Sequence, residues 1–232
     1  MSQVLVTVSG LLVGRGSAAV AGPFDVVIRS GAALLVTGPN GAGKSTLLRT
    51  LAGLLRPISG TVSVEGALAP DGEAARHLAE ACHYVGHRNA MKPSVAVGDN
   101  LAFWARFLGG GGTSVTAALE AVGLPGVAHL PFAYLSAGQQ RRASLARLLV
   151  AARPVWILDE PTSALDSASQ ARFAGLVDDH RRAGGIAIAA THQPLGLEDA
   201  ESLSLAPGAV DSSVTGSPDI DEAALDAAEG WL

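Results

Sequence analysis

A glycine-rich loop at residues 38–46 limits the folds that this chain can adopt. The loop reads Gly-Pro-Asn-Gly-Ala-Gly-Lys-Ser-Thr and matches the phosphate-binding pattern G-x-x-x-x-G-K-[ST] in full. The apolar run at 33–37 predicts a buried strand before the loop, and residues 45–55 predict a helix after it. Glycines allow the tight turn, and a helix N-terminus carries partial positive charge. The loop therefore predicts an α/β core that binds polyphosphate, whereas a plain glycine turn would not need this strand-helix context.

Two side chains of the loop have specific expected roles. Lys44 is expected to reach the β- and γ-phosphates of a nucleotide, and the Ser45 hydroxyl is expected to ligate Mg²⁺. The residues of the loop that we expect to contact the nucleotide are Gly38, Pro39, Asn40, Gly41, Ala42, Gly43, Lys44, Ser45 and Thr46.

Composition limits the classes of protein to which the chain can belong. Its 232 residues can bury a sizeable core, and no stretch approaches the ~18 uncharged apolar residues that a membrane span needs. The single cysteine, Cys82, cannot form an internal disulfide, which fits a reducing compartment. Six of the 21 acidic residues and none of the 16 basic residues lie in 208–232, so the rest of the chain is nearly neutral. We therefore expect a cytosolic protein with no nucleic-acid partner.

Strands and helices alternate along most of the chain. Strands at 4–8 and 24–28, around a loop containing Gly14-Arg15-Gly16, predict an antiparallel lobe, and further strands are predicted at 61–64, 83–85, 155–160, 186–190 and 202–205. Helices are predicted at 73–80, 97–108, 114–122, 137–152 and 167–183. This order predicts a mainly parallel sheet flanked by helices, with a helical subdomain inserted at about 88–152. The domain would cover 1–207, followed by an acidic extension at 208–232.

Two acids follow the apolar strand predicted at 155–160. Asp159 at a strand end can hold the Mg²⁺ shell, and the adjacent Glu160 can polarise an attacking water. The pair by itself is equally consistent with a structural role. Together with the phosphate loop it predicts nucleotide hydrolysis.

A third motif stands at the head of the helix predicted at 137–152. Leu-Ser-Ala-Gly-Gln-Gln at 135–140 offers a serine hydroxyl, a glycine backbone and a helix N-terminus, which together suit a γ-phosphate. The run resembles the LSGGQ signature of ABC-type ATPases, with alanine in place of the first glycine. Ser-Ala-Leu-Asp at 163–166 is similar to the D-loop of that family, and Thr191-His192 is similar to its switch histidine.

The resemblance to ABC-type ATPases covers residues 1 to about 207. It implies a P-loop NTPase fold of the ABC ATPase type, ATP and Mg²⁺ as ligands, and Lys44, Glu160 and His192 as catalytic residues. It also implies a homodimer that pairs head to tail, so that each ATP lies between the phosphate loop of one subunit and the signature of the other. The signature residues in contact with the nucleotide would be Ser136, Ala137, Gly138 and Gln139.

Two positions depart from the common pattern of the family. His87 stands where the family usually has a glutamine that approaches the Mg²⁺, and histidine, unlike glutamine, can titrate. Arg15 stands where an aromatic residue usually stacks on adenine, and a guanidinium plane can also stack on a base. We therefore include Arg15 among the nucleotide-binding residues and His87 among the candidate metal ligands, beside Ser45 and Asp159.

These departures occur within stretches that resemble one branch of the family. Residues 84–92, 99–104 and 191–195, with Arg15-Gly16, are similar to the ATP-binding subunits of haem exporter-type complexes in bacterial cytochrome c maturation. This resemblance implies an integral-membrane subunit of the CcmB type, further maturation subunits, and a place on the cytoplasmic face of the inner membrane. Haem would be the substrate of the complex and not of this chain.

Other functions remain open from the sequence. An ATPase of another small-molecule transporter shares every core motif, and a nucleotide-dependent scaffold could share the fold. A DNA-repair or chromosome ATPase would need a long coiled coil and usually a basic face, and this chain has neither. The presence of both Glu160 and His192 favours hydrolysis over the scaffold.

Overall fold

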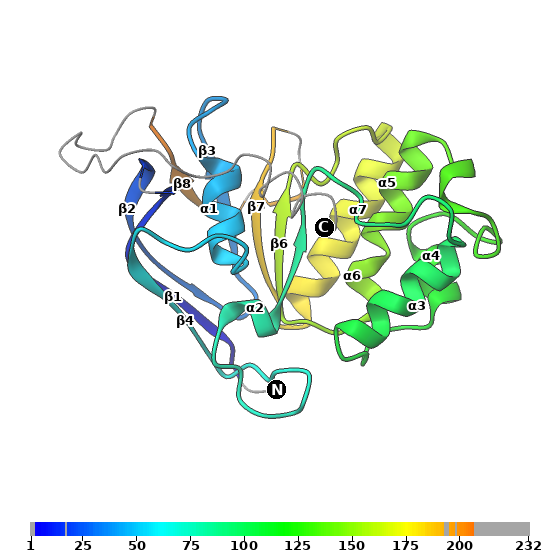
Figure 1. The fold of residues 1–232 in the computed structure, drawn as a ribbon, viewed down its shortest axis with the longest axis horizontal. Coiled ribbons are helices and arrows are strands. Elements are labelled where there is room, and N and C mark those ends of the chain that lie inside the picture. The colour runs from blue at the N-terminus through cyan, green and yellow to red at the C-terminus, as the bar shows by residue number, and fades with distance from the viewer. Residues whose placement is uncertain (1–2, 17, 193–194, 198, 207–232) are drawn as a thin grey trace.

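Two β-sheets organise the chain (Figure 1). The computed structural model describes residues 3–16, 18–192, 195–197 and 199–206. The antiparallel sheet has the order β2-β1-β4 and is built from β1 (Leu5–Arg15), β2 (Ala18–Arg29) and β4 (Ser59–Glu65). The second sheet has the order β5-β6-β7-β3-β8, with every neighbouring pair parallel; its strands are β3 (Ala33–Thr37), β5 (Cys82–Val85), β6 (Val155–Asp159), β7 (Ile186–Ala190) and β8 (Glu201–Ser204). The predicted α/β fold with an antiparallel lobe is confirmed.

The parallel sheet separates two hydrophobic cores. All residues of β6 and β7 are buried, as expected for central strands that are covered on both faces. On one face, Ile157 and Ile188 pack in the same core as Leu48 of α1 (Lys44–Leu51). On the other face, the alternate residues of the strands, such as Trp156 and Leu158, join the core of the helices. Helix α1 lies between the two sheets, and this position places the phosphate loop at its N-terminus (Figure 1).

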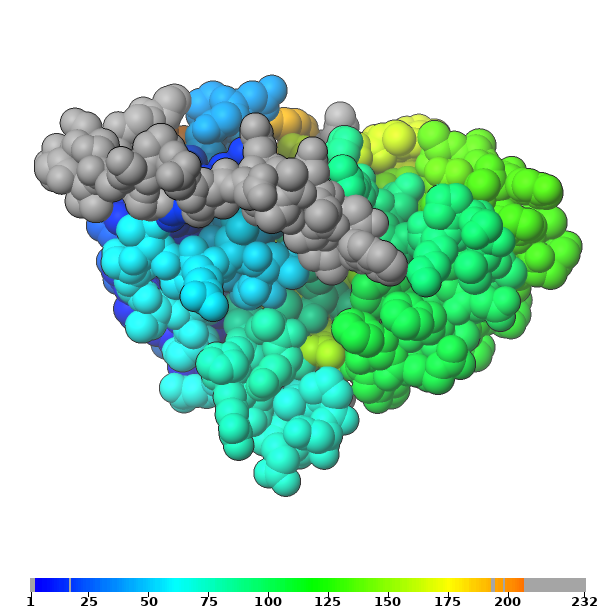
Figure 2. All heavy atoms as spheres, in the orientation of Figure 1, coloured from blue at the N-terminus to red at the C-terminus, as the bar shows by residue number. Residues whose placement is uncertain are grey.

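A group of helices lies between β5 and β6 in the chain. It contains α3 (Val97–Phe107), α4 (Val115–Ala121), a 3₁₀ turn at Phe132–Tyr134, α5 (Ala137–Leu145) and α6 (Arg147–Val150). This segment forms the side of the molecule away from the antiparallel sheet (Figures 1 and 2). Three aromatic residues lie on α3: Trp104 is buried, whereas Phe103 and Phe107 are exposed. Helix α7 (Ser167–Arg182) connects β6 to β7.

Several predicted elements differ from the observed ones. The predicted helix at 73–80 is wrong for most of its length, since only α2 (Leu78–Ala81) is helical. An isolated bridge between Leu68 and Ala74 and a turn at Gly72, with φ of 87°, occupy the preceding backbone. The helix predicted at 137–152 divides at Ala146, where the Leu149 N–H bonds to the Ala146 carbonyl in a tighter turn.

The antiparallel strands and the first helix also differ in length from the prediction. Strands β1 and β2 form a long hairpin that includes Gly14 and Arg15, because register shifts allow pairing to continue past Gly10. Helix α1 ends at Leu51, short of the predicted Leu55.

In the described residues, no helix combines the length and the apolar character needed to cross a membrane. The acidic extension predicted at 208–232 lies outside the described residues.

Candidate functional site

The phosphate loop connects β3 to α1 and depends on its glycines. Gly38, Gly41 and Gly43 have φ of 137°, 82° and 95°, in the region that other L-residues rarely adopt. A Cβ on Gly38 would also lie 2.5 Å from the Leu205 carbonyl oxygen, and one on Gly43 would lie 2.8 Å from Cγ1 of Val20. The sequence pattern therefore reflects both backbone conformation and close packing.

Lys44 is held across the loop by backbone carbonyls. Its Nζ donates hydrogen bonds to the carbonyl oxygens of Gly38, at 2.7 Å, and Pro39, at 3.0 Å. Among the residues that the structure describes, no side chain caps α1, whose N-cap is Gly43, so the backbone N–H groups of its first turn can bind an anion. The charge of Lys44 and the helix N-terminus make this end of α1 suitable for phosphate.

Asp159 and Ser45 face each other beside the loop. The Ser45 hydroxyl donates to Oδ1 of Asp159 at 3.1 Å, and the Tyr84 hydroxyl donates to Oδ2 at 3.3 Å. Burial, reinforced by the charge of Asp159, raises the pKa of Tyr84 to about 12, so its hydroxyl remains protonated. Asp159, at the end of β6, is 5% exposed and presents its carboxylate with a fixed orientation.

Glu160 follows directly and has an unusual backbone. Its φ is 48°, in the left-handed region, where a non-glycine residue costs about 1–3 kcal/mol. Its N–H donates to the Ala190 carbonyl at 2.8 Å, which ties the ends of β6 and β7 together. Oε1 of Glu160 lies 3.6 Å from Nε2 of His192, and both side chains are partly exposed. The turn therefore directs the carboxylate toward His192.

Lys44, Ser45, Asp159 and Glu160 line one cavity of about 570 Å³, and His192 lies outside this lining, beside Glu160. Its lining joins the loop, the end of β6 and the hairpin of the antiparallel sheet: Arg15, Val20, Asn40, Gly41, Gly43, Lys44, Ser45, Thr46, Asp159 and Glu160. Two further loop residues, Gly38 and Pro39, accept the hydrogen bonds of Lys44, and Ala42 is buried in the adjacent core. The structure thus brings together side chains that are more than 100 positions apart in the chain.

The remaining predicted residues do not line this cavity. Ser136 is the exposed N-cap of α5: its Oγ accepts from the Gln139 N–H at 3.3 Å, and Oε1 of Gln139 accepts from the Ser136 N–H at 2.9 Å. Ala137 and Gly138 belong to the same helix start. His87 lines a separate cavity of about 450 Å³, together with Arg88, Trp104 and Phe107.

The oxygen donors of the cavity fit one kind of metal ion. The described residues contain no cluster of three or more His, Cys, Asp or Glu side chains that could hold a metal by themselves. Ser45 and Asp159 nevertheless present two oxygens at 3.1 Å from each other, and Mg²⁺ usually takes one or two protein ligands with phosphates and waters. The donor set therefore fits Mg²⁺ that arrives with a nucleotide.

Sequence reasoning missed three side chains that support the site. Tyr84 bonds to Asp159 and accepts a hydrogen bond from Nε of Arg49 at 3.4 Å. Arg141, on α5, bonds to three backbone carbonyls, including that of Glu160. The sequence holds a signal for Arg141, because in the helix predicted at 137–152 it shares one face with Leu145 and Leu148, at i+4 and i+7.

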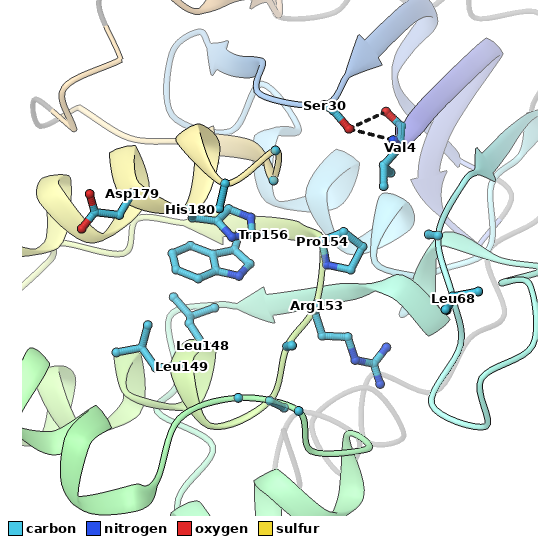
Figure 3. A pocket seen from close by; sticks show the side chains of 18 of the residues that line it. Val4, Ser30, Leu68, Leu148, Leu149, Arg153, Pro154, Trp156, Asp179 and His180 are labelled. Carbon is cyan, nitrogen blue, oxygen red and sulfur yellow. Dashed lines mark hydrogen bonds between the residues drawn. The ribbon is translucent and has the colours of Figure 1, made fainter. Parts of the chain in front are cut away.

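Another cavity, of about 920 Å³, contains none of the predicted residues (Figure 3). The rings of Trp156 and His180 stack there, with their centroids 3.9 Å apart. Burial lowers the pKa of His180 to about 4, so the imidazole is neutral at physiological pH. The cavity is mostly apolar and lies outside the candidate site.

Comparison with known proteins places the chain in a family. Residues 22–163 match the family model described as ABC transporter. The "Cytochrome c biogenesis ATP-binding export protein CcmA" of Rhizobium meliloti (strain 1021) is 54% identical over 200 residues, which are 84% of this chain and 95% of the relative. The protein of the same name from Nitrobacter winogradskyi is 55% identical over 189 residues, which are 82% and 92% of the two chains.

Solved structures share the fold. A putative ABC transporter ATP-binding protein from Pyrococcus furiosus aligns with a TM-score of 0.73 at 24% identity, over 87% of this chain and 97% of that one. The ATP binding subunit of an ABC transporter aligns with a TM-score of 0.74 at 20% identity, over 87% and 85%. The match to the family model and the relatives at more than 50% identity show that the chain belongs to the ATP-binding proteins of ABC transporters, as an ATPase of the CcmA type.

Proposed function

We propose that this chain is the ATP-hydrolysing subunit of a membrane complex that drives a haem-handling step of cytochrome c biogenesis. The observation that carries the proposal is the convergence of Lys44, Ser45, Asp159 and Glu160 on one cavity at the ends of parallel strands. The relatives named for cytochrome c biogenesis, at more than 50% identity, support the biological role.

The loop and its flanking residues bind the nucleotide. When ATP binds, Lys44 exchanges its hydrogen bonds to the carbonyls of Gly38 and Pro39 for bonds to the β- and γ-phosphates. The N–H groups of α1 donate to the same phosphates. Arg15, at the cavity wall, supplies a guanidinium plane on which a base can stack. Ser45 and Asp159 would hold Mg²⁺, which neutralises phosphate charge when it is bound.

Glu160 acts as the general base for water. Its carboxylate stands at the edge of the same cavity, and Asp159 beside it has both oxygens bonded, to Ser45 and to Tyr84. Glu160 is therefore the acid that is better placed to take a proton. His192, 3.6 Å from Glu160, holds the γ-phosphate and orients the base.

The signature completes the site from a second subunit. Ser136 and Gly138 lie at the start of α5 and do not line the cavity of their own chain, while Ser136 and Ala137 are exposed. A head-to-tail homodimer would bring them to the γ-phosphate held by Lys44 of the partner. ATP then closes the dimer, and hydrolysis reopens it, which is the two-state movement that can drive a membrane subunit.

The cavity around His87 is the proposed docking groove for the membrane subunit. It lies between β5 and α3, so it connects the catalytic core to the helical segment, and it combines aromatic side chains with exposed Arg88. A CcmB-type subunit would dock here and hold the dimer at the cytoplasmic face of the inner membrane. Haem would be handled by the complex, with no contact to this chain.

The proposed biological role is tested in cells that lack the chain. We expect c-type cytochromes to lose their covalently attached haem, while b-type cytochromes, which bind haem non-covalently, keep theirs. The measurement is haem staining of membrane proteins after denaturing electrophoresis, with the parent gene supplied on a plasmid as the control. Unchanged staining of c-type cytochromes in the deleted strain would contradict the role.

Charge reversal in the docking groove should uncouple ATP hydrolysis from the membrane subunit. Arg88→Glu is expected to weaken association with the membrane subunit roughly tenfold or more, because a repulsive charge replaces an attractive one at the interface. ATP turnover of the isolated subunit should be unchanged. Co-purification from detergent extracts and turnover with and without the membrane subunit measure the two effects.

Arg106→Glu is the matched control for this experiment. Arg106 is exposed on α3 but does not line the groove. This variant should co-purify with the membrane subunit as the parent does. If Arg88→Glu also matches the parent in co-purification and coupling, the groove is not the docking site.

A further inference from the structure

Arg141 is a buried arginine that connects three parts of the chain. It lies on α5 and is 3% exposed. Its Nε donates to the Pro161 carbonyl, Nη1 donates to the Gly86 carbonyl, and Nη2 donates to the Glu160 carbonyl, each at 2.8 Å. Burial lowers the pKa of Arg141 to about 10, which leaves it charged at neutral pH.

The acceptors of Arg141 belong to the segments that flank the proposed nucleotide site. Glu160 and Pro161 follow β6, and Gly86 follows β5 just before His87 in the docking groove. The peptide groups of Glu160 are held on both sides, since its N–H bonds to Ala190 and its carbonyl accepts from Arg141 and from the Ser163 hydroxyl at 3.0 Å. These bonds hold Glu160 at its φ of 48°, a conformation that the residue would not favour by itself.

The position of Arg141 on α5 connects these bonds to the signature. Helix α5 begins directly after Ser136, roughly one and a half turns before Arg141, and a short helix moves as a unit. A displacement of Ser136 along with α5 would therefore also displace Arg141 and the Glu160 carbonyl to which it donates. In the proposed homodimer, Ser136 contacts the ATP of one site, whereas Glu160 of the same chain acts on the ATP of the other.

We propose that Arg141 is a positioning residue that couples the two ATP sites, by making the orientation of Glu160 depend on the position of the signature helix. The inference rests on the proposed function, in which Glu160 is the base and the signature acts in trans. Closure over ATP at one site moves α5, and Arg141 carries that movement to Glu160 at the other site. The bond from Arg141 to the Gly86 carbonyl adds a third connection, which links the docking groove to the same helix.

Only a guanidinium can make this set of bonds. Its planar group presents five donors in fixed directions, and here it serves three carbonyls from two segments. The single ammonium of a lysine has a shorter reach and lacks the planar fork. Lysine keeps the positive charge but cannot make all three bonds, so this replacement tests the bonds separately from the charge.

The test compares the ATP dependence of turnover in the parent and in Arg141→Lys. The parent is expected to show a Hill coefficient above 1, and the variant a coefficient close to 1, since two coupled sites become independent. We expect kcat to fall on the order of tenfold, because a displaced base costs rate. The affinity of the subunit for ATP, measured by fluorescence of a labelled nucleotide, should change by less than about twofold, because Arg141 does not line the nucleotide cavity.

Arg142→Lys provides the matched control. Arg142 is the next residue on α5, and its Nη1 donates to a backbone carbonyl at the same distance, 2.8 Å, but that carbonyl belongs to Gly123 in the helical segment. A merely structural loss of an arginine-to-carbonyl bond would affect both variants alike. The control should keep the Hill coefficient and kcat of the parent.

The outcomes distinguish this inference from the proposed function. If Glu160→Gln retains turnover, the proposed base is wrong and the inference fails with it. If Glu160→Gln is inactive while Arg141→Lys matches the parent in kcat and Hill coefficient, only the coupling role is overturned. A Hill coefficient of 1 in the parent, or the loss of folded structure in both Arg141→Lys and Arg141→Gln by circular dichroism, would also overturn it.

Discussion

Replacing Glu160 with glutamine is expected to reduce ATP turnover by roughly 100-fold or more, the usual contribution of a general base. Glutamine keeps the size of the side chain and its hydrogen-bonding capacity but cannot accept a proton from water. The carbonyl bond to Arg141 and the N–H bond to Ala190 involve the backbone alone, so the local fold should persist. Binding of ATP should therefore remain near the parent value while phosphate release, measured in steady state, is almost lost.

Two further variants make the result for Glu160 specific. Glu120→Gln removes an exposed carboxylate on α4, away from the cavity, and should hydrolyse ATP like the parent. Lys44→Ala removes the charge in the phosphate loop and should lose ATP binding itself, a different defect. Parental turnover in Glu160→Gln would exclude Glu160 as the base.

Replacing Ser136 with arginine should reduce turnover to a similar extent through a different step. The serine lies at the exposed start of α5 and does not line the cavity that holds Lys44. A bulky side chain there leaves ATP binding to the single subunit intact, but it blocks the approach of the second subunit. We therefore expect roughly 100-fold slower turnover with an unchanged dissociation constant for ATP on the isolated subunit.

Ser114→Arg is the control that separates loss of association between the two ATPase subunits from loss of a helix cap. Ser114 is also an N-cap, and its hydroxyl accepts from the Ala117 N–H at 3.2 Å at the start of α4. Both replacements lose a cap worth about 1 kcal/mol, so they should lower the melting temperature similarly. Only the Ser136 variant should lose turnover, and equal losses in both would attribute the effect to stability.

Much of the fold follows from local sequence patterns. Residues 33–37 and 186–190 are predominantly apolar runs, and both are strands in the structure: β7 is buried throughout, and β3 is buried at three of its five positions. The glycines at 38, 41 and 43 predict a loop with positive φ angles at these positions, and the structure has them. The position of Asp159 at a strand end follows from the apolar run before it, because parallel strands present their carboxyl ends at one edge.

Other features depend on contacts between distant segments. The hydroxyl of Tyr84 meets Asp159 because β5 and β6 are neighbours in the sheet, and nothing near position 84 indicates that pairing. The break at Ala146 occurs within a run of good helix formers, where local propensity predicts continuity. The residues at 73–77 have helical composition, but pairing of the Ala75 N–H with the Ala67 carbonyl directs them into a turn.

The proposed partnership between subunits rests on the resemblance of residues 135–140 to the ABC signature. Within one chain, the structure adds that Ser136 is exposed and absent from the lining of the loop cavity. An exposed anion-binding motif at a helix start, apart from the phosphate loop, is consistent with action in trans. Hydrolysis by this mechanism therefore requires a dimer that forms around ATP.

Sedimentation velocity of Glu160→Gln with and without Mg²⁺ and ATP tests this claim most directly, because slow hydrolysis lets the closed state accumulate. We predict a monomer without nucleotide and a dimer with ATP, while the double variant Glu160→Gln/Ser136→Arg binds ATP and remains a monomer. A Glu160→Gln subunit that is saturated with ATP and still sediments as a monomer would contradict the account, as would an ATP-dependent dimer that the Ser136 replacement leaves intact.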